Sequence, residues 1–101
     1  MNGKLYVAVA DSLGPGARLA QCAHAVAEVH AAQPDACRAW RGDSNTVVIL
    51  AMPTARLGEL AQHEGATSFR EPDLGNELTA VAVFPRDGDT LRLLRRARLA
   101  A

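Results

Sequence analysis

Three short apolar runs, each about as long as one β-strand, constrain the fold of this 101-residue chain more than any other feature. They span residues 4–10, 45–52 and 78–84, and stretches with the helical spacing of apolar residues separate them. The run over residues 45–52 is apolar on both faces, which predicts a strand in the centre of a sheet. Helices interleaved with apolar strands predict a sheet that is covered by helices on both faces.

The remaining elements follow from turn residues and apolar spacing. We expect helices over residues 17–33, 34–40, 54–63 and 90–99, and a further strand over residues 66–70. A loop of about seven residues joins the last two strands, so that pair can be antiparallel and the sheet mixed. Trp40 is expected to anchor the core. The sequence therefore predicts a single α/β domain over residues 1–101, with three α/β/α layers and a four-stranded mixed sheet.

Composition limits how the chain can bind nucleic acid. Lysine plus arginine and aspartate plus glutamate each number 11, so the formal net charge is zero and only a local patch could bind RNA. Such a patch exists near the C-terminus, where Arg92, Arg95 and Arg96 lie on the outer side of the last expected helix. These arginines either contact RNA phosphates or form a solvated helix face, and the sequence leaves both interpretations open.

The cysteines and the N-terminal sequence bear on location. Cys22 and Cys37 have no CxxC or histidine spacing around them, so we expect reduced thiols and no metal site. The N-terminal apolar run has the length of a strand and lacks a secretory cleavage site, and no stretch approaches the roughly 20 apolar residues of a membrane span. We therefore expect a soluble cytoplasmic domain with no membrane partner.

A Gly/Pro turn opens onto a helix with polar side chains on one face. Gly14 and Gly16 would let a ligand approach the backbone and leave the first helical amides unpaired, which makes a modest anion site. Gln21, His24 and Glu28 form the polar stripe of this helix. Histidine can carry a proton and glutamine can orient a water or a carbonyl, but both also suit a solvated surface. The opposite stripe, expected to pack on the sheet, consists of Leu19, Cys22, Ala23, Val26 and Val29.

Two loops leave strand ends and are the candidate positions for a ligand. The first spans residues 11–16 and the second spans residues 71–77. Asp73 in the second loop is either an ordinary turn residue or a carboxylate that orients water or a ribose hydroxyl. Glu77 is either a surface charge or a second carboxylate close enough to raise the pKa of one of the two.

The first loop and its helix carry a motif. Residues 16–25 read GARLAQCAHA, which resembles the helix start G-K-I-A-A-Q-C-x-H-A of the type II peptidyl-tRNA hydrolase family. Asp73, Leu74 and Gly75 fit the D-x-G landmark of that family. Residues 79–85, TAVAVFP, are similar to its T-V-L-G-I-G-P strand. The resemblance covers almost the whole chain, with two departures: the family lysine is Ala17 here, and the loop after the aspartate is shortened.

The resemblance implies the fold of that family and hydrolysis of the ester that joins a peptide to the terminal ribose of tRNA. It also implies tRNA as the partner and activity without metal or cofactor. The candidate catalytic residues are Asp73, His24, Gln21 and Arg18, of which Arg18 could supply a cation beside the position of the lost lysine. The candidate substrate-binding residues are Gly14, Gly16, Gly75, Glu77, Thr79, Arg92, Arg95 and Arg96.

Two other functions stay open. Loss of the family lysine at Ala17 favours a catalytically impaired relative that binds tRNA or a protein, whereas retention of Gln21, His24 and Asp73 favours the enzyme. A small-molecule or regulatory binding domain could also share only the fold, because a fold does not fix a function. A homodimer is left open as well.

Overall fold

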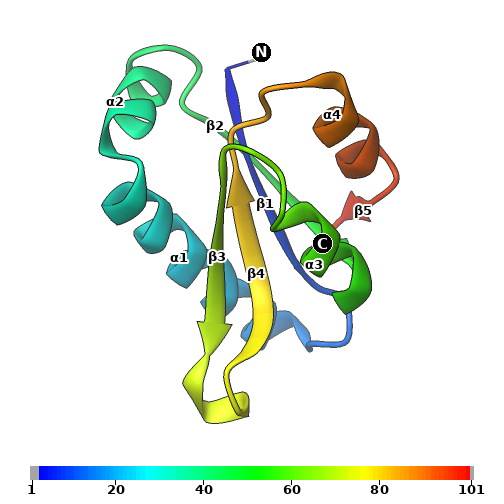
Figure 1. The fold of residues 1–101 in the computed structure, drawn as a ribbon. Helices are drawn as coiled ribbons and strands as arrows, with labels where there is room; N and C mark the ends of the chain where they lie inside the picture. Colours follow the sequence, from blue (N-terminus) through cyan, green and yellow to red (C-terminus); the bar gives the residue numbers. More distant parts are fainter. Residues whose placement is uncertain (1–2, 101) are drawn as a thin grey trace.

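Residues 3–100, which a computed structural model of the chain describes, form one mixed sheet with helices on both faces (Figure 1). The strands are β1 (Lys4–Ala10), β2 (Thr46–Met52), β3 (Ala66–Glu71), β4 (Glu77–Val83) and β5 (Arg98–Leu99). The helices are α1 (Pro15–Ala32), α2 (Pro34–Gly42), α3 (Thr54–Leu60) and α4 (Gly88–Arg95), and a short 3₁₀ helix, η1, covers Pro72–Leu74. The predicted α/β class and the mixed sheet are confirmed.

The strand order is β3-β4-β1-β2-β5, so β1 lies in the centre of the sheet. It pairs in parallel with β2 and antiparallel with β4, which in turn pairs antiparallel with β3. Leu5, Val7 and Val9 of β1 are fully buried. The expected central position of residues 45–52 is wrong, because only the two-residue strand β5 flanks β2 on its outer side and Val47 remains exposed.

The sheet has five strands within the described residues rather than the four expected. The additional strand β5 was expected to be the end of the last helix, because Leu93, Leu94 and Ala97 have helical spacing. Helix α4 instead ends at Arg95, and the chain returns to the sheet, where Leu99 pairs with Leu50 of β2. The unpaired backbone groups at the edge of a strand can form hydrogen bonds with a further strand. The helical spacing of nearby apolar residues does not predict this pairing.

Alternate side chains of the sheet pack into two separate hydrophobic cores. On one face, α1 and α2 contribute Cys22, Ala25, Val29, Cys37 and Trp40. On the other face, α3 and α4 contribute Leu57, Leu60, Leu93 and Leu94. Trp40 is buried, as predicted, and its indole Nε1 donates a hydrogen bond of 2.9 Å to the carbonyl oxygen of Thr46. No helix formed by residues 3–100 is long and apolar enough to cross a membrane.

The two candidate ligand loops lie at the same end of the sheet (Figure 1). Because β4 runs antiparallel to β1, with Ala80 opposite Val9, the beginning of β4 lies beside the end of β1. The loop after β1 and the turn between β3 and β4 therefore lie at the same end of the sheet.

Helix α1 is rotated from the orientation that its apolar spacing predicts, although Cys22 and Val29 are buried as expected. Gln21, assigned to the polar stripe, is 6% exposed, whereas Leu19, assigned to the apolar stripe, is 70% exposed. Contacts of α1 with β3, β4 and β1 centre its buried side on Gln21, Ala25 and Val29. In this orientation the buried Gln21 side chain has hydrogen-bond partners on β3 and β4.

A pair of leucine substitutions tests this packing. Leu57→Ala removes a fully buried side chain of α3 and should lower the free energy of unfolding by about 2–5 kcal/mol. Leu19→Ala, the same change at an exposed position, should alter it by less than about 0.5 kcal/mol. Urea unfolding followed by circular dichroism measures both, and a large loss in Leu19→Ala would contradict the observed rotation of α1.

Candidate functional site

A buried glutamine connects three elements at the end of the sheet where the two loops meet. Gln21 of α1 donates from Nε2 to Oε2 of Glu71 at 2.9 Å, and its Oε1 accepts a hydrogen bond of 2.8 Å from the Thr79 hydroxyl. Gln21 and Thr79 are buried, and Glu71 is half-buried. We call these three residues, Gln21, Glu71 and Thr79, the Gln21 cluster.

A β-bulge directs Thr79 toward α1. Between β3 and β4 the register passes from Phe69 opposite Ala80 to Arg70 opposite Leu78, which leaves Thr79 as the additional residue. Ala80 packs in the core under α1, and the neighbouring Thr79 contacts Gln21 on the same side of the sheet. Two consecutive side chains on one face are impossible in a regular strand but are typical of a bulge.

Glu71 also connects the cluster to Asp73. The backbone amide of Asp73 donates to Oε1 of Glu71 at 3.2 Å, so Gln21 and Asp73 share one carboxylate. The hydrogen bond from Gln21 and then that from the Asp73 amide hold the pKa of Glu71 below its ordinary value, and the nearby charge of His24 acts in the same direction. Glu71 is therefore ionised at neutral pH.

The turn after Glu71 presents the Asp73 carboxylate to solvent. Gly75 and Asn76 both have positive φ, of 65° and 63°, which closes the turn within a few residues. The Asn76 amide donates to the Glu71 carbonyl at 3.0 Å, and Arg70 Nη1 donates to the Asn76 carbonyl at 3.2 Å. Gly75 has a left-handed backbone conformation, which glycine adopts more readily than other residues. This explains the glycine of the D-x-G motif in structural terms.

His24 lies on the exposed side of α1 and stacks on β3. Its ring is parallel to that of Phe69 within 9°, with the two centroids 4.5 Å apart. The stack fixes the imidazole next to the Gln21 cluster while leaving it accessible to solvent. Among the predicted catalytic residues, the structure therefore brings together Gln21, His24 and Asp73.

Glu77 and Thr79 occupy different environments. Glu77 is exposed at the start of β4 and pairs across the strands with Glu71. The carboxylate next to Glu77 is thus Glu71, whose pKa is lowered rather than raised. Thr79 is fully buried and hydrogen-bonded to Gln21, so it can position other groups but does not reach a ligand in this structure.

Arg18 is held by backbone carbonyls. Its guanidinium donates to the carbonyl oxygens of Leu13 at 2.8 Å, Asp11 at 2.7 Å and Ala100 at 3.3 Å. These bonds connect the loop after β1 to the end of the described chain. Arg18 therefore stabilises this loop and is not a free cation at the Gln21 cluster.

The fold does not require glycine at the start of α1. Gly14 has a φ of −71°, and a Cβ atom at Gly14 or Gly16 would meet no atom within 4 Å. Both residues are exposed, beside the first amides of the helix. They are compatible with close approach of a ligand, as the sequence predicts.

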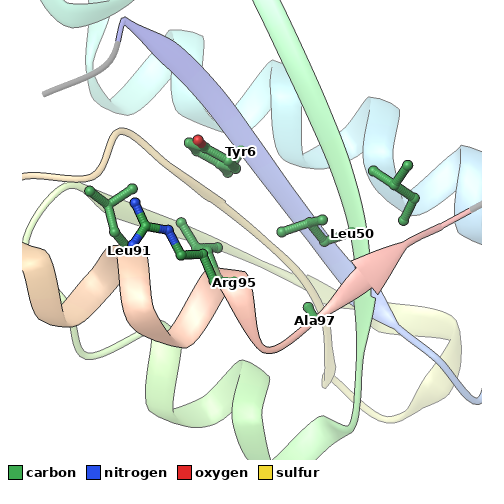
Figure 2. Close-up of a pocket in the computed structure, with 7 residues that line it drawn as sticks. Tyr6, Leu50, Leu91, Arg95 and Ala97 are labelled. Carbon is green, nitrogen blue, oxygen red and sulfur yellow. The ribbon is translucent and has the colours of Figure 1, made fainter.

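The arginines of α4 lie on the other side of the sheet from the Gln21 cluster. Helix α4 packs in the core that faces α3, whereas Gln21 belongs to α1. Arg95 and Leu91 project from α4 beside Tyr6 and Leu50 of the sheet and line a cavity of about 220 Å³ (Figure 2). The predicted binding residues Arg92, Arg95 and Arg96 therefore do not converge with Asp73 and His24.

Sequence reasoning missed Glu71, the residue at the centre of the site. It was assigned to the loop, although Thr67, Phe69 and Glu71 alternate in the sequence and contact α1 or the Gln33 residue that caps it, on the same face of β3. Extending the alternation of β3 by one residue would have placed Glu71 opposite the helix.

Neither a metal centre nor a reactive thiol is found in the described part of the chain. No group of histidine, cysteine, aspartate or glutamate side chains there is arranged to hold a metal ion. Cys22 and Cys37 are free and buried, and burial raises the pKa of both thiols.

No family model matches the sequence, and no curated protein does either. The relation to peptidyl-tRNA hydrolases stays a prediction from the motifs.

Removing the Thr79 hydroxyl tests the cluster. Thr79→Val keeps the shape of the side chain but leaves Oε1 of the buried Gln21 without its donor, which should cost about 1–3 kcal/mol of unfolding free energy. Thr54→Val, at an exposed position, should change it by less than about 0.5 kcal/mol. Equal stabilities of the two variants in urea unfolding would show that the hydrogen bond between Thr79 and Gln21 contributes nothing.

The lowered pKa of Glu71 predicts a dependence of stability on pH. The unfolded chain binds this proton at a higher pH than the folded chain, so the stabilisation is present above the ordinary pKa of glutamate and is lost as pH falls through the folded value. Wild type should therefore lose stability more steeply than Glu71→Gln below about pH 4.3, the ordinary pKa of glutamate. Parallel pH profiles from urea unfolding would contradict the hydrogen-bonded carboxylate.

Proposed function

We propose that this chain hydrolyses the ester bond of peptidyl-tRNA, or of a related acyl-tRNA, and releases peptide and tRNA. The motif over residues 16–25 and the D-x-G sequence at Asp73 motivate the proposal. The observation that carries it is the convergence of these two motifs, because the Gln21 side chain and the Asp73 amide donate to the same carboxylate. We place this activity in the cytoplasm, where the substrate is made.

Ester hydrolysis needs a positioned water and a group that accepts its proton. We assign the orientation of water or of a ribose hydroxyl to the Asp73 carboxylate, which is exposed beside the cluster. His24 is the proton carrier in this scheme, because its imidazole is exposed and lies close enough to Glu71 for its charge to lower the pKa of that carboxyl. Gln21 and Thr79 act as positioning residues, since both are buried and bonded to each other.

The glycines at the start of α1 suit the approach of the acyl-tRNA end. Gly14 and Gly16 leave the backbone without a covering side chain, although a Cβ atom at either position would meet no neighbouring atom within 4 Å. The amides of a helix N-terminus attract anionic groups such as a nucleotide phosphate. In this scheme the 3′ end of the tRNA lies between the loop after β1 and the turn at Asp73.

A tRNA- or protein-binding relative without activity is the second candidate, and Arg18 favours it. The family lysine is replaced by Ala17, and the neighbouring Arg18 donates to three carbonyls rather than facing the cluster. The cluster therefore lacks a cation at the position of the family lysine, where it could stabilise the developing negative charge of ester cleavage.

The assignment of Asp73 is tested by hydrolysis of N-acetyl-aminoacyl-tRNA with purified protein. Asp73→Asn preserves the backbone amide and the shape of the turn but removes the charge, so cleavage should slow by about 100-fold or more. Asp35→Asn, an exposed aspartate on α2, is the matched control and should leave the rate unchanged. Circular dichroism checks that both variants fold.

The assay separates the two candidate functions. Equal rates for wild type and Asp73→Asn would show that Asp73 is only a turn residue. Binding of tRNA by wild type without cleavage would overturn the hydrolase proposal in favour of the binding relative.

A further inference from the structure

A chain of three polar side chains lies between α3 and α4, away from the Gln21 cluster. Nδ1 of His63 is 2.7 Å from the hydroxyl oxygen of Thr90, and that hydroxyl is 2.9 Å from Oδ1 of Asp87. The Thr90 amide also donates to Oδ1 of Asp87 at 2.8 Å, so Asp87 caps the start of α4. Thr90 is fully buried, so this row of three hydrogen-bonded side chains is held within the fold.

The direction of these hydrogen bonds determines the protonation of His63. The two bonds from Thr90 hold the pKa of Asp87 below its ordinary value, so this carboxylate is ionised and can only accept. The single hydroxyl proton of Thr90 must therefore point to Asp87. Thr90 can then only accept from His63, so Nδ1 of His63 carries a proton and the neutral ring has its lone pair on Nε2.

His63 borders a cavity of about 370 Å³ between the two helices. Because Nδ1 of His63 is hydrogen-bonded to Thr90, Nε2 is the ring nitrogen that can bind a ligand in this cavity. Arg92 of α4 and Arg96, which follows the last residue of that helix, line the same cavity together with the carboxylates of Glu59 and Asp89. Arg92 pairs with Asp89 through Nη2 only, so most of its N–H donors remain available.

We propose that the cavity between α3 and α4 binds a phosphate group through Nε2 of His63 and the guanidinium groups of Arg92 and Arg96. Guanidinium groups match the geometry of phosphate oxygens, and a protonated imidazole adds a third charged donor. This site lies on the opposite face of the sheet from the Gln21 cluster and does not depend on ester cleavage.

The charges around His63 make the binding dependent on pH. The charged groups that line the cavity beside His63 are Glu59, Asp89, Arg92 and Arg96. Arg56, Glu64, Arg86 and Asp87 lie outside this lining on the surrounding elements, and Arg95 lines the separate cavity beside Tyr6. Acidic and basic groups are equal in number in the lining, so the proton on Nε2 decides whether the cavity attracts an anion. Phosphate should bind more tightly below the range in which histidine titrates than above it.

The first test is nuclear magnetic resonance of the histidine rings in the full chain. At about pH 8, above the range in which histidine titrates, His63 should show the tautomer protonated on Nδ1. Sulfate, whose charge is constant in this range, then serves as the probe. Its affinity, read from the His63 signals, should be about fivefold higher near pH 5.5 than near pH 8, the equivalent of one exposed charged pair.

Matched substitutions locate the site. Arg96→Gln should weaken sulfate binding by about fivefold, and His63→Gln should remove its pH dependence. Arg38→Gln is the control, because Arg38 is an exposed arginine outside the cavity that pairs with Asp35 as Arg92 pairs with Asp89, and the change should have no effect. A proton on Nε2 rather than Nδ1 in the neutral ring, no saturable shift of His63, or equal losses in Arg96→Gln and Arg38→Gln would each overturn the proposal.

A second ligand distinguishes the sources of phosphate. An RNA hairpin that shifts the His63 signals and competes with sulfate would identify the nucleic-acid backbone as the ligand, with a salt dependence that weakens in Arg96→Gln. Binding of inorganic phosphate without any effect of the hairpin would identify a free or terminal phosphate group. Both results support the phosphate site.

Discussion

The geometry of the candidate site depends on the carboxylate of Glu71. One of its oxygens accepts from a helix residue, Gln21, and the other from the turn residue Asp73, so a single side chain connects α1 to the turn between β3 and β4. Gln21 is buried, and a buried amide without partners would be costly, which ties its placement to Glu71 and Thr79. The rotation of α1, the bulge in β4 and the place of His24 over Phe69 are all consistent with this one arrangement.

Much of the fold could be predicted because it depends on local patterns. Residues 4–10 form a strand as expected, and the antiparallel pairing of the last two strands follows from their short connection. The rest of the fold depends on contacts between residues that are far apart in the sequence. Strand β5 forms because the edge of β2 offers backbone partners, and Leu19 lies exposed beside that edge, where it lines a cavity with Val47 and Leu99. Apolar spacing within one helix carries no information on either point.

The candidate site was predicted in part for the same reason. The motifs placed Gln21 and His24 on the helix after the first loop and Asp73 in the second loop, and the topology brings both loops to the same end of the sheet. Glu71 was missed because its role depends on a strand that continues one residue further than expected. Arg18 was assigned a role as a cation, yet its partners are carbonyls of a loop and of Ala100, which no spacing along the chain reveals. His63 gave no signal because its partner Thr90 lies 27 residues away.

The central claim is that the Gln21 cluster orders the turn that carries Asp73, and backbone relaxation by nuclear magnetic resonance tests it most directly. The measurement compares the order parameters of the amides of residues 72–76 in wild type and in Gln21→Leu, a change that keeps the bulk of the side chain but removes both hydrogen bonds. We expect values typical of rigid backbone in wild type and markedly lower values in the variant. Equal order parameters in the two proteins would show that the turn is ordered without the cluster, and would contradict the account.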